Sequence, residues 1–347
     1  MPHNHDEEIL FLGPAGRGGM RSVIDAYATV FDPFKIIFTQ KEGSTAKKIM
    51  VGIASMSQFI WRLLIDRKIK VVHVHVCSGV SFFRKRAFLN VASFFGKKTV
   101  FHCHGAEFEQ FYAANTDAVR ATLARVDAVV ALSDFWKEFF ESKGCSNVIA
   151  IRNPVPPARI DRHPVGDGRV HFALVGVICD RKGCFDVVKM AEKYHSQLSG
   201  KVMIHLAGNG EGERLQRDID RLGLSDVLSY EGWADAEKKA ALLNSADVYF
   251  LPSHNEGLPI SILEGMTYEL PVLSTPVGGI PSVVREGENG LLVPPADIDQ
   301  MYQAIMTLAS DPSLRETMGA RSLEISRDYL VDNVKKELDA FYDRLLK

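Results

Sequence analysis

Cysteine is scarce in this chain of 347 residues, and its five cysteines are scattered at positions 77, 103, 145, 179 and 184. Because they lack paired C-x-x-C spacing, neither a zinc site nor a disulfide framework is expected. Buried thiols in a reducing compartment are the simplest interpretation, so we expect a cytoplasmic location.

The chain also lacks an excess of one charge, a long apolar run and a secretory leader. A net charge of −2 gives no reason to expect nucleic-acid binding. No apolar run approaches the roughly 20 residues that span a bilayer. Residues 1–8 are polar and acidic, unlike a signal peptide. The length and the 46% hydrophobic content predict a globular protein of two domains.

Short apolar runs alternate with helical patterns along the whole chain, which predicts an α/β fold with parallel sheets. Six runs precede a proline-rich segment at residues 153–164, which has the composition of an interdomain linker, and six follow it. The predicted strands are 9–12, 36–39, 71–76, 99–103, 128–132 and 148–151, then 170–175, 202–206, 227–230, 248–251, 272–274 and 291–293.

The most informative motif is the segment from Ser253 to Glu264, which follows the predicted strand 248–251. Pro259 suits the start of a helix, because its ring fixes φ and it has no N–H to leave unpaired. Glu256 then lies in a loop and Glu264 more than one turn inside the helix, at least roughly 7 Å away. This arrangement suits an elongated ligand with hydroxyl groups at both ends and a phosphate near the helix N-terminus, such as a nucleotide-sugar.

This segment resembles the Glu-x7-Glu motif of the retaining glycosyltransferases of the GT-B fold, in glycosyltransferase family 4. The resemblance extends over nearly the whole chain. It implies two Rossmann-like domains facing a central cleft, with a final helix that crosses back to the N-terminal domain. We therefore expect an acceptor domain at residues 1–157, a nucleotide-sugar domain at 158–325 and a crossing helix at 326–347.

The resemblance assigns roles to the two glutamates and to two glycine-containing loops. Glu256 would bind the donor hexose, with the backbone N–H groups of Gly257 and Leu258, and Glu264 would bind the ribose. The Gly18-Gly19 pair would lie against the donor diphosphate, since glycines let backbone N–H groups approach a phosphate closely. The loop that contains Asn209 and Gly210 would border the nucleobase and phosphate.

A basic pair, Arg181 and Lys182, follows the predicted strand 170–175 and could neutralise charge on a leaving diphosphate. The family usually carries an arginine directly after the glycine at the position of Gly176, but this chain has Val177 there. Arg181 would then supply the missing charge from a neighbouring position.

Four histidines at positions 73, 75, 102 and 104 lie on or just after two predicted strands. The His104-Gly105 step resembles the family's donor-sugar histidine, which implies that His104 contacts the sugar. A metal site at the four histidines is an alternative, but the family needs no metal, because the basic pair neutralises the phosphate. We therefore expect no metal and no cofactor besides the nucleotide-sugar co-substrate.

Residues 41–98 carry 12 basic and two acidic residues. Within residues 81–98, four residues that repeat at i, i+3, i+4 and i+7 would pack on a sheet: Phe88, Val91, Ala92 and Phe95. Phe82, Phe83 and Phe94 are left over. They keep open a contact between residues 81–98 and an anionic membrane surface.

These patterns predict a retaining hexosyltransferase that moves a hexose or N-acetylhexosamine from a nucleoside-diphosphate sugar, with UDP favoured. The acceptor would be a glycan or a lipid-linked hydroxyl in bacterial surface polysaccharide synthesis. Two alternatives stay open: a nucleotide-sugar epimerase of the same fold, and a non-catalytic subunit that binds a sugar nucleotide.

Overall fold

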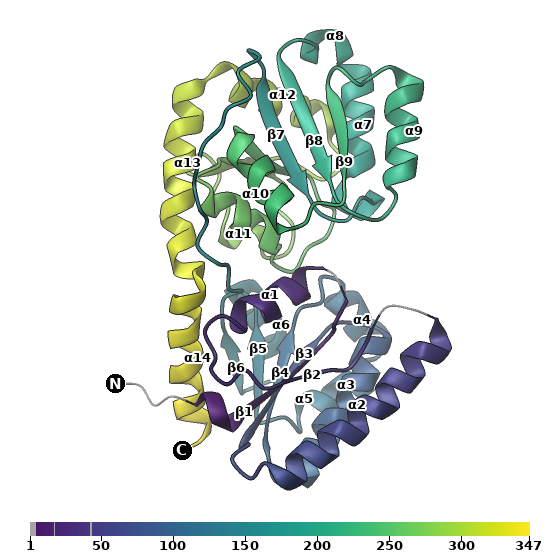
Figure 1. The fold of residues 1–347 in the computed structure, drawn as a ribbon, viewed down its shortest axis with the longest axis vertical. Coiled ribbons are helices and arrows are strands. Elements are labelled where there is room, and N and C mark those ends of the chain that lie inside the picture. The colour runs from purple at the N-terminus through teal and green to yellow at the C-terminus, as the bar shows by residue number, and fades with distance from the viewer. Residues whose placement is uncertain (1–4, 17, 42–43) are drawn as a thin grey trace. The chain divides into compact units, whose positions relative to one another are not determined.

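The computed structural model describes residues 5–16, 18–41 and 44–347. The chain divides into two compact units. The N-terminal unit comprises residues 1–155 and 329–347, and the C-terminal unit comprises residues 156–328 (Figure 1). The chain passes between the units at residues 155–156, inside the proline-rich segment, and again at residues 328–329.

Each unit is built on a six-stranded parallel sheet. In spatial order the N-terminal sheet contains β2 (Ile36–Phe38), β1 (Ile9–Gly13), β3 (Val71–Val76), β4 (Lys98–Cys103), β5 (Ala128–Ala131) and β6 (Val148–Ala150). The C-terminal sheet contains β12 (Gly290–Leu292), β11 (Val272–Ser274), β10 (Val248–Leu251), β7 (Val170–Val175), β8 (Val202–Ala207) and β9 (Leu228–Gly232). All twelve predicted strands are present, and the predicted α/β class is confirmed.

Helices cover both faces of each sheet, which explains why the central strands are apolar on both faces. The helices of the N-terminal unit are η1 (Asp6–Glu8), α1 (Gly19–Tyr27), α2 (Thr45–Ile65), α3 (Val80–Phe94), α4 (Phe108–Ala114), α5 (Thr116–Leu123), α6 (Asp134–Ser142) and α14 (Val331–Leu345). Those of the C-terminal unit are η2 (Asp180–Lys182), α7 (Cys184–Lys193), α8 (His195–Leu198), α9 (Gly212–Leu222), α10 (Ala236–Ser245), α11 (Ile260–Thr267), η3 (Ile280–Ser282), α12 (Ile298–Ser310) and α13 (Pro312–Ser326). The short helix η4 (Arg327–Tyr329) spans the boundary between the units.

The final helix, α14, belongs to the N-terminal unit, as the family resemblance implies (Figure 1). The Tyr342 hydroxyl lies 2.7 Å from Nδ1 of His73 on β3. Lys335 Nζ lies 3.0 Å from a carboxylate oxygen of Asp6 and 2.6 Å from one of Asp339. A buried hydrogen bond and a partly buried ion-pair cluster thus attach the last helix to the first sheet.

Helix α2 corrects one expectation from the sequence. Its segment Lys48–Ile65 is long and apolar enough to cross a membrane by length and composition. Only 17% of that segment is buried. Such a helix is weak evidence for a membrane span. Its exposed side chains include Ile53 at 65% and Trp61 at 63% exposure. An apolar surface therefore runs along a helix whose sequence contains scattered serines and basic residues that interrupt the apolar run.

Candidate active site

The strand order of the C-terminal sheet determines where a ligand can bind. The first strand of this unit, β7, lies between β10 and β8, so the chain winds outward from β7 in both directions. Open α/β sheets bind ligands at the carboxyl ends of the strands where the winding direction reverses. The loop after β7 carries Arg181 and Lys182, and the loop after β10 carries Glu256. The sequence therefore places three charged side chains at this switch point.

Glu256 is buried, with 6% exposure, and its carboxylate is held by two neighbours. Lys182 Nζ lies 2.5 Å from Oε1 of Glu256, and the Ser253 hydroxyl donates a hydrogen bond of 2.8 Å to the same oxygen. Arg181 Nη1 lies 3.6 Å from that oxygen. Two cations that the sequence assigned to a diphosphate thus converge on the carboxylate that it assigned to the hexose.

The loop that carries Glu256 is tied to the preceding cationic loop. The Arg181 guanidinium donates a 2.7 Å hydrogen bond to the carbonyl oxygen of Asn255, and the backbone N–H of His254 donates to the carbonyl oxygen of Arg181 at 2.8 Å. The His254 ring lies 2.5 Å from a carboxylate oxygen of Asp186 on α7. These bonds fix the relative positions of Arg181 and Glu256.

A close approach of two backbones supports Glu256 from the other side. Gly278 has φ +55°, and a Cβ at this position would lie 1.8 Å from the carbonyl oxygen of Glu256. The N–H of Gly279 donates to the carbonyl oxygen of Gly257 at 2.6 Å. Only glycine fits at position 278, because both the left-handed backbone and the lack of space exclude a side chain.

Glu264 is the fifth residue of α11, more than one turn inside the helix as predicted. Pro259 is the cap residue directly before that helix. The Glu264 carboxylate is mostly buried and forms an ion pair with Lys239 of α10. Burial is the main reason why the pKa of Tyr249 on β10 is raised. The charges of Glu264 and Glu256 raise it further, so both carboxylates lie near this tyrosine.

Asn209 and Gly210 lie in the loop after β8, next to the loop after β7. The carbonyl oxygen of Asn209 accepts a 2.6 Å hydrogen bond from Ile178 N–H, and the N–H of Glu211 donates to the carbonyl oxygen of Ile178 at 2.8 Å. Gly210 has φ +105°, and a Cβ there would lie 2.9 Å from the Val177 side chain. Val177 is 39% exposed. It therefore occupies the surface where the family usually presents an arginine.

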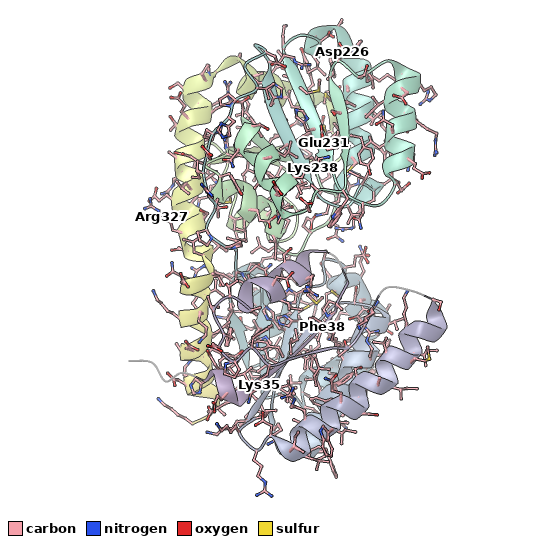
Figure 2. All side chains as sticks on the ribbon, in the orientation of Figure 1. Lys35, Phe38, Asp226, Glu231, Lys238 and Arg327 are labelled. Atoms are coloured by element: carbon pink, nitrogen blue, oxygen red, sulfur yellow. The ribbon has the colours of Figure 1, made fainter. Side chains whose placement is uncertain are left out.

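The end of β9 and the start of α10 carry two charged residues, Glu231 and Lys238, which lie close together (Figure 2). Glu231 on β9 accepts hydrogen bonds from Ser229 at 2.7 Å and pairs with His205 Nδ1 at 2.9 Å. Lys238 of α10 lies 3.9 Å from the Glu231 carboxylate. The neighbouring Trp233 is 46% exposed.

The remaining predicted site residues belong to the N-terminal unit. Gly18, with φ +131°, precedes the first residue of α1, Gly19, and a Cβ on either glycine would have no atom within 4 Å. Packing therefore does not require Gly19, which leaves room for a ligand-related role. Arg17, in the same loop, lies outside the described residues.

His104 follows β4, and its Nε2 lies 2.8 Å from Nδ1 of His75. Burial lowers the pKa of His104 to about 3, so its imidazole is neutral at physiological pH. A neutral ring can accept or donate a hydrogen bond to a sugar hydroxyl without adding charge.

Two family models match this chain. "Glycosyl transferases group 1" matches residues 158–324, and "Glycosyltransferase Family 4" matches residues 40–159. The chain belongs to glycosyltransferase family 4. The family resemblance predicted from the sequence is thereby confirmed.

The curated relatives of this family-4 chain include biosynthetic glycosyltransferases. A Salmonella typhimurium protein named as a colanic acid biosynthesis glycosyltransferase, WcaL, is 25% identical over 253 residues, which cover 69% of this chain and 62% of that protein. A D-inositol 3-phosphate glycosyltransferase of Kribbella flavida is 32% identical over 174 residues, which cover 48% of this chain and 41% of that protein. The chain spans about three fifths of the length of WcaL.

Solved structures share the fold over the whole chain. Anabaena HepE in complex with UDP superposes with a TM-score of 0.77 and 16% identity, covering 97% of this chain and all of that one. Sucrose-phosphate synthase from Thermosynechococcus elongatus gives a TM-score of 0.75 with 17% identity, covering 97% and 98%. The predicted GT-B architecture is confirmed.

The remaining histidines form a buried group on β3 and β4 of this family-4 chain. The candidate ligand atoms of His73, His75 and His102 all lie within 4.8 Å of one another. His73 Nε2 lies 2.9 Å from His102 Nδ1, so these rings hydrogen-bond to each other. The absence of a metal stays a prediction from the family resemblance.

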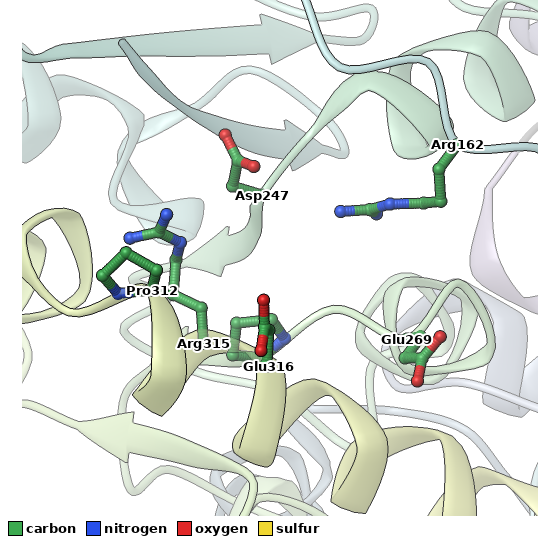
Figure 3. A pocket seen from close by; sticks show the side chains of 7 residues that line it. Arg162, Asp247, Glu269, Pro312, Arg315 and Glu316 are labelled. Atoms are coloured by element: carbon green, nitrogen blue, oxygen red, sulfur yellow. The ribbon is translucent and has the colours of Figure 1, made fainter. Parts of the chain in front are cut away.

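One pocket lies away from the predicted site (Figure 3). It has a volume of about 300 Å³ and is lined by Arg162, Asp247, Glu269, Pro271, Pro312, Arg315 and Glu316. Asp247 precedes β10 and accepts a hydrogen bond from His171 N–H at 2.8 Å, which places the pocket at the amino end of that strand. Glu256 lies beyond the carboxyl end, so this pocket is not the donor site.

Sequence reasoning missed three side chains that organise the site: Ser253, Lys239 and Tyr249. Ser253 is the first residue of the recognised motif and Tyr249 precedes it, but nothing in their local pattern distinguishes a site residue from a core residue. Lys239 is 25 residues before Glu264, and only the fold brings these two side chains of α10 and α11 together. Charged residues are common on helix surfaces, so the sequence did not distinguish Lys239 as a site residue.

Proposed function

We propose that this chain is a retaining glycosyltransferase that transfers a hexose or N-acetylhexosamine from a nucleoside-diphosphate sugar to an acceptor hydroxyl. The observation that carries this proposal is the pairing of Lys182 with the buried Glu256 at the switch point of the C-terminal sheet. A buried ion pair at a ligand-binding edge presents both an acceptor for sugar hydroxyls and a cation for phosphate.

The roles follow from charge and position. Glu256, with the backbone of Gly257 and Leu258, would bind the hexose, and Glu264 would bind the ribose. Arg181, Lys182 and the Gly18-Gly19 loop would bind the diphosphate. Asn209 and Gly210 would border the nucleobase and phosphate, and His104 would contact the sugar.

We favour a front-face mechanism, in which the leaving phosphate helps to deprotonate the acceptor hydroxyl. A double-displacement glycosidase needs two carboxyl groups about 5–5.5 Å apart. In this chain the carboxylate of Glu264 is engaged by Lys239 on α10, and that of Glu256 is engaged by Lys182. Developing charge on the leaving diphosphate would be stabilised by Arg181 and Lys182. No metal or other cofactor is needed in this scheme.

UDP is the favoured donor nucleotide, because HepE and other proteins of this fold were solved with UDP. The acceptor would be a glycan or a lipid-linked sugar, since WcaL is named for colanic acid biosynthesis. A cytoplasmic location, on the inner face of the membrane, agrees with five cysteines that form no disulfide.

Substitution of Glu256 by Gln tests this proposal. It should lower turnover of UDP-sugars by 100-fold or more, because the charged acceptor for the hexose is lost, while UDP binding stays nearly intact. Glu237→Gln, on the exposed face of α10, is the matched control.

Three results would argue against the proposed role. Unchanged turnover in Glu256→Gln would remove that residue from the mechanism. Conversion of the donor to an isomer without acceptor would identify an epimerase. Tight UDP binding with no turnover of any donor would identify a non-catalytic subunit.

Contact with a membrane is a separate part of the proposal, and the structure changes its location. Within residues 81–98, Phe82 is buried, whereas Phe83 and Phe94 are 46% and 86% exposed. The larger apolar surface lies on α2, which packs against α3. We therefore extend the proposed contact from residues 81–98 to both helices.

Liposome flotation tests this contact. Wild type should float with anionic vesicles and less with neutral ones, because residues 41–98 are strongly basic. Trp61→Ser in combination with Phe94→Ser should reduce flotation without loss of UDP binding. Equal, negligible flotation with both vesicle types would contradict the contact.

A further inference from the structure

Lys85 on α3 is a buried cation that no role above uses. The side chain is 1% exposed, and its Nζ has no hydrogen-bond partner among the described residues. Burying an unpaired ammonium group in a protein interior costs several kcal/mol. A buried ammonium group is therefore rare unless an anion pairs with it, which raises the question of which anion pairs with Lys85.

Among the described residues, no carboxylate acts on Lys85. Burial lowers the pKa of Lys85 well below its ordinary value, and the neighbouring Arg84 acts in the same direction. Cys77 is the one group that acts the other way, but burial raises the pKa of its thiol to about 11. Cys77 therefore stays protonated and uncharged near pH 7.

Arg84 adds a second incompletely satisfied cation. Its Nη2 donates a 2.6 Å hydrogen bond to the side-chain oxygen of Gln40, while its Nε is buried without a partner among the described residues. Burial lowers the pKa of this guanidinium too. Arg84 and Lys85 are adjacent in the chain, and the only hydrogen-bond acceptor for either side chain among the described residues is the neutral Gln40 on Arg84, so positive charge is in local excess.

Lys85 lies near the start of α3 and the carboxyl ends of β3 and β4. Helical side chains lean toward the helix N-terminus, so the ammonium of this sixth helical residue lies by the first turn. Its charge lowers the pKa of His104, after β4, and acts on Cys77, after β3. The first turn of α3 contains no acidic residue, and Gly79 before it provides no side-chain cap. The positive end of the helix dipole therefore adds to the two cations.

The strand order of the N-terminal sheet also favours a ligand site near Lys85. In the order β2-β1-β3-β4 the winding direction reverses between β1 and β3. The loop Cys77–Gly79 follows β3 at this reversal, and Gly105 packs against it, with its Cβ position 3.1 Å from Ser78 N. Ligands bind at such a reversal in open α/β sheets.

We propose that Lys85 and the N-terminus of α3 form an oxyanion subsite that takes a phosphate or carboxylate group of the acceptor. This inference rests on the proposed transferase function, because it assigns the acceptor as a sugar phosphate or a uronic acid. In the proposed function, Arg181 and Lys182 of the C-terminal unit bind the donor diphosphate. Lys85 is therefore assigned to an anionic group of the acceptor.

Thermal unfolding of wild type, Lys85→Met and Lys137→Met tests the subsite with three probes: inorganic phosphate, glucuronate and UDP. Lys137 is the control, because it forms only a half-exposed pair with Glu141 on the surface of α6. We expect phosphate or glucuronate to raise the melting temperature of wild type and Lys137→Met. In Lys85→Met the half-saturating anion concentration should rise at least tenfold, while the UDP response is unchanged. The stronger of the two anions shows whether the acceptor carries phosphate or carboxylate.

Each contrary result has a distinct meaning. An anion response that survives in Lys85→Met, or is absent from wild type, overturns the subsite. A UDP response lost in Lys85→Met assigns the cation to the donor and overturns the acceptor assignment. If UDP stabilises no variant, the proposed donor site fails, while the anion probes still test Lys85.

Two further variants guard against misfolding. Lys85→Arg keeps the cation and should retain the anion response, whereas Lys85→Gln should lose it. Lys85→Met should melt no lower than wild type without ligand, because it removes an unpaired buried charge. A large loss of stability in all three variants would show that Lys85 is structural and would overturn the proposal.

Discussion

At the scale of single residues, the ion pair between Lys182 and Glu256 controls both the stability and the chemistry of the site. Their side chains are 11% and 8% exposed, so removing one partner leaves the other charge buried. A bound diphosphate would compete with Glu256 for Lys182, and a bound hexose would compete with Lys182 for Glu256. In the proposed function, the pair would hold both side chains in place until the donor binds.

Lys182→Met should lower the free energy of unfolding by about 3 kcal/mol, because it leaves the buried Glu256 with only the more distant Arg181 as a cation. It should also weaken UDP binding, because it removes a cation proposed to bind the diphosphate. The double variant Lys182→Met, Glu256→Gln should recover most of that stability but no UDP binding. Urea denaturation of the four proteins in the cycle measures the coupling. Additive effects of the two substitutions would show that the pair does not form.

At the scale of secondary-structure elements, β3 and β4 carry a buried histidine group with a predictable pH dependence. Burial lowers the pKa of His73 and His104 to about 3 and that of His75 and His102 well below 6.5. The folded state therefore resists protonation of these rings, while the unfolded chain accepts protons near pH 6.5. Their contribution to stability is complete above that pH and decreases as the pH falls toward 3.

Between pH 6.5 and 5, each such histidine should steepen the loss of stability by up to about 1.4 kcal/mol per pH unit. His73→Gln should make the slope shallower by about one histidine's share. Chemical denaturation at a series of pH values measures the slopes. Equal slopes for wild type and His73→Gln would contradict the buried, neutral state of His73.

The elements themselves were predictable, and the contacts between loops were not. Strands such as Val71–Val76 and Val248–Leu251 are continuous apolar runs, because parallel strands are covered on both faces. The ion pair of Lys182 and Glu256 joins residues 74 positions apart, and only the order β10-β7 makes them neighbours. No local pattern carries that information.

Helix α2 shows the opposite difficulty. Its pattern predicted a helix, but not that the apolar residues would face outward, since that depends on what packs against it. Lys85 is similar, because a lysine in a basic segment resembles a solvated charge until the fold buries it. The family resemblance supplied the glutamate roles, whereas only the structure supplied their partners Lys239 and Ser253.

At the scale of the whole molecule, each unit has its own sheet and its own candidate site at a switch point. The C-terminal unit presents the carboxylates and cations that suit a nucleotide-sugar. The N-terminal unit presents two further groups proposed for the donor, His104 and the Gly18-Gly19 loop, and one group proposed for the acceptor, Lys85. In this proposal the donor diphosphate and the acceptor oxyanion are bound by different cations. Nucleotide binding should therefore depend on the C-terminal residues and respond little to changes near Lys85.

The most direct test of the account is thermal unfolding with UDP, GDP, ADP, dTDP and CMP, for wild type and Glu264→Ala. A ligand at 100 times its dissociation constant adds about 2.7 kcal/mol to stability. The account predicts that UDP gives the largest rise in the melting temperature of wild type and that Glu264→Ala loses it. No rise with any nucleotide, or an equal rise in Glu264→Ala, would contradict the assignment of the C-terminal unit as the donor site.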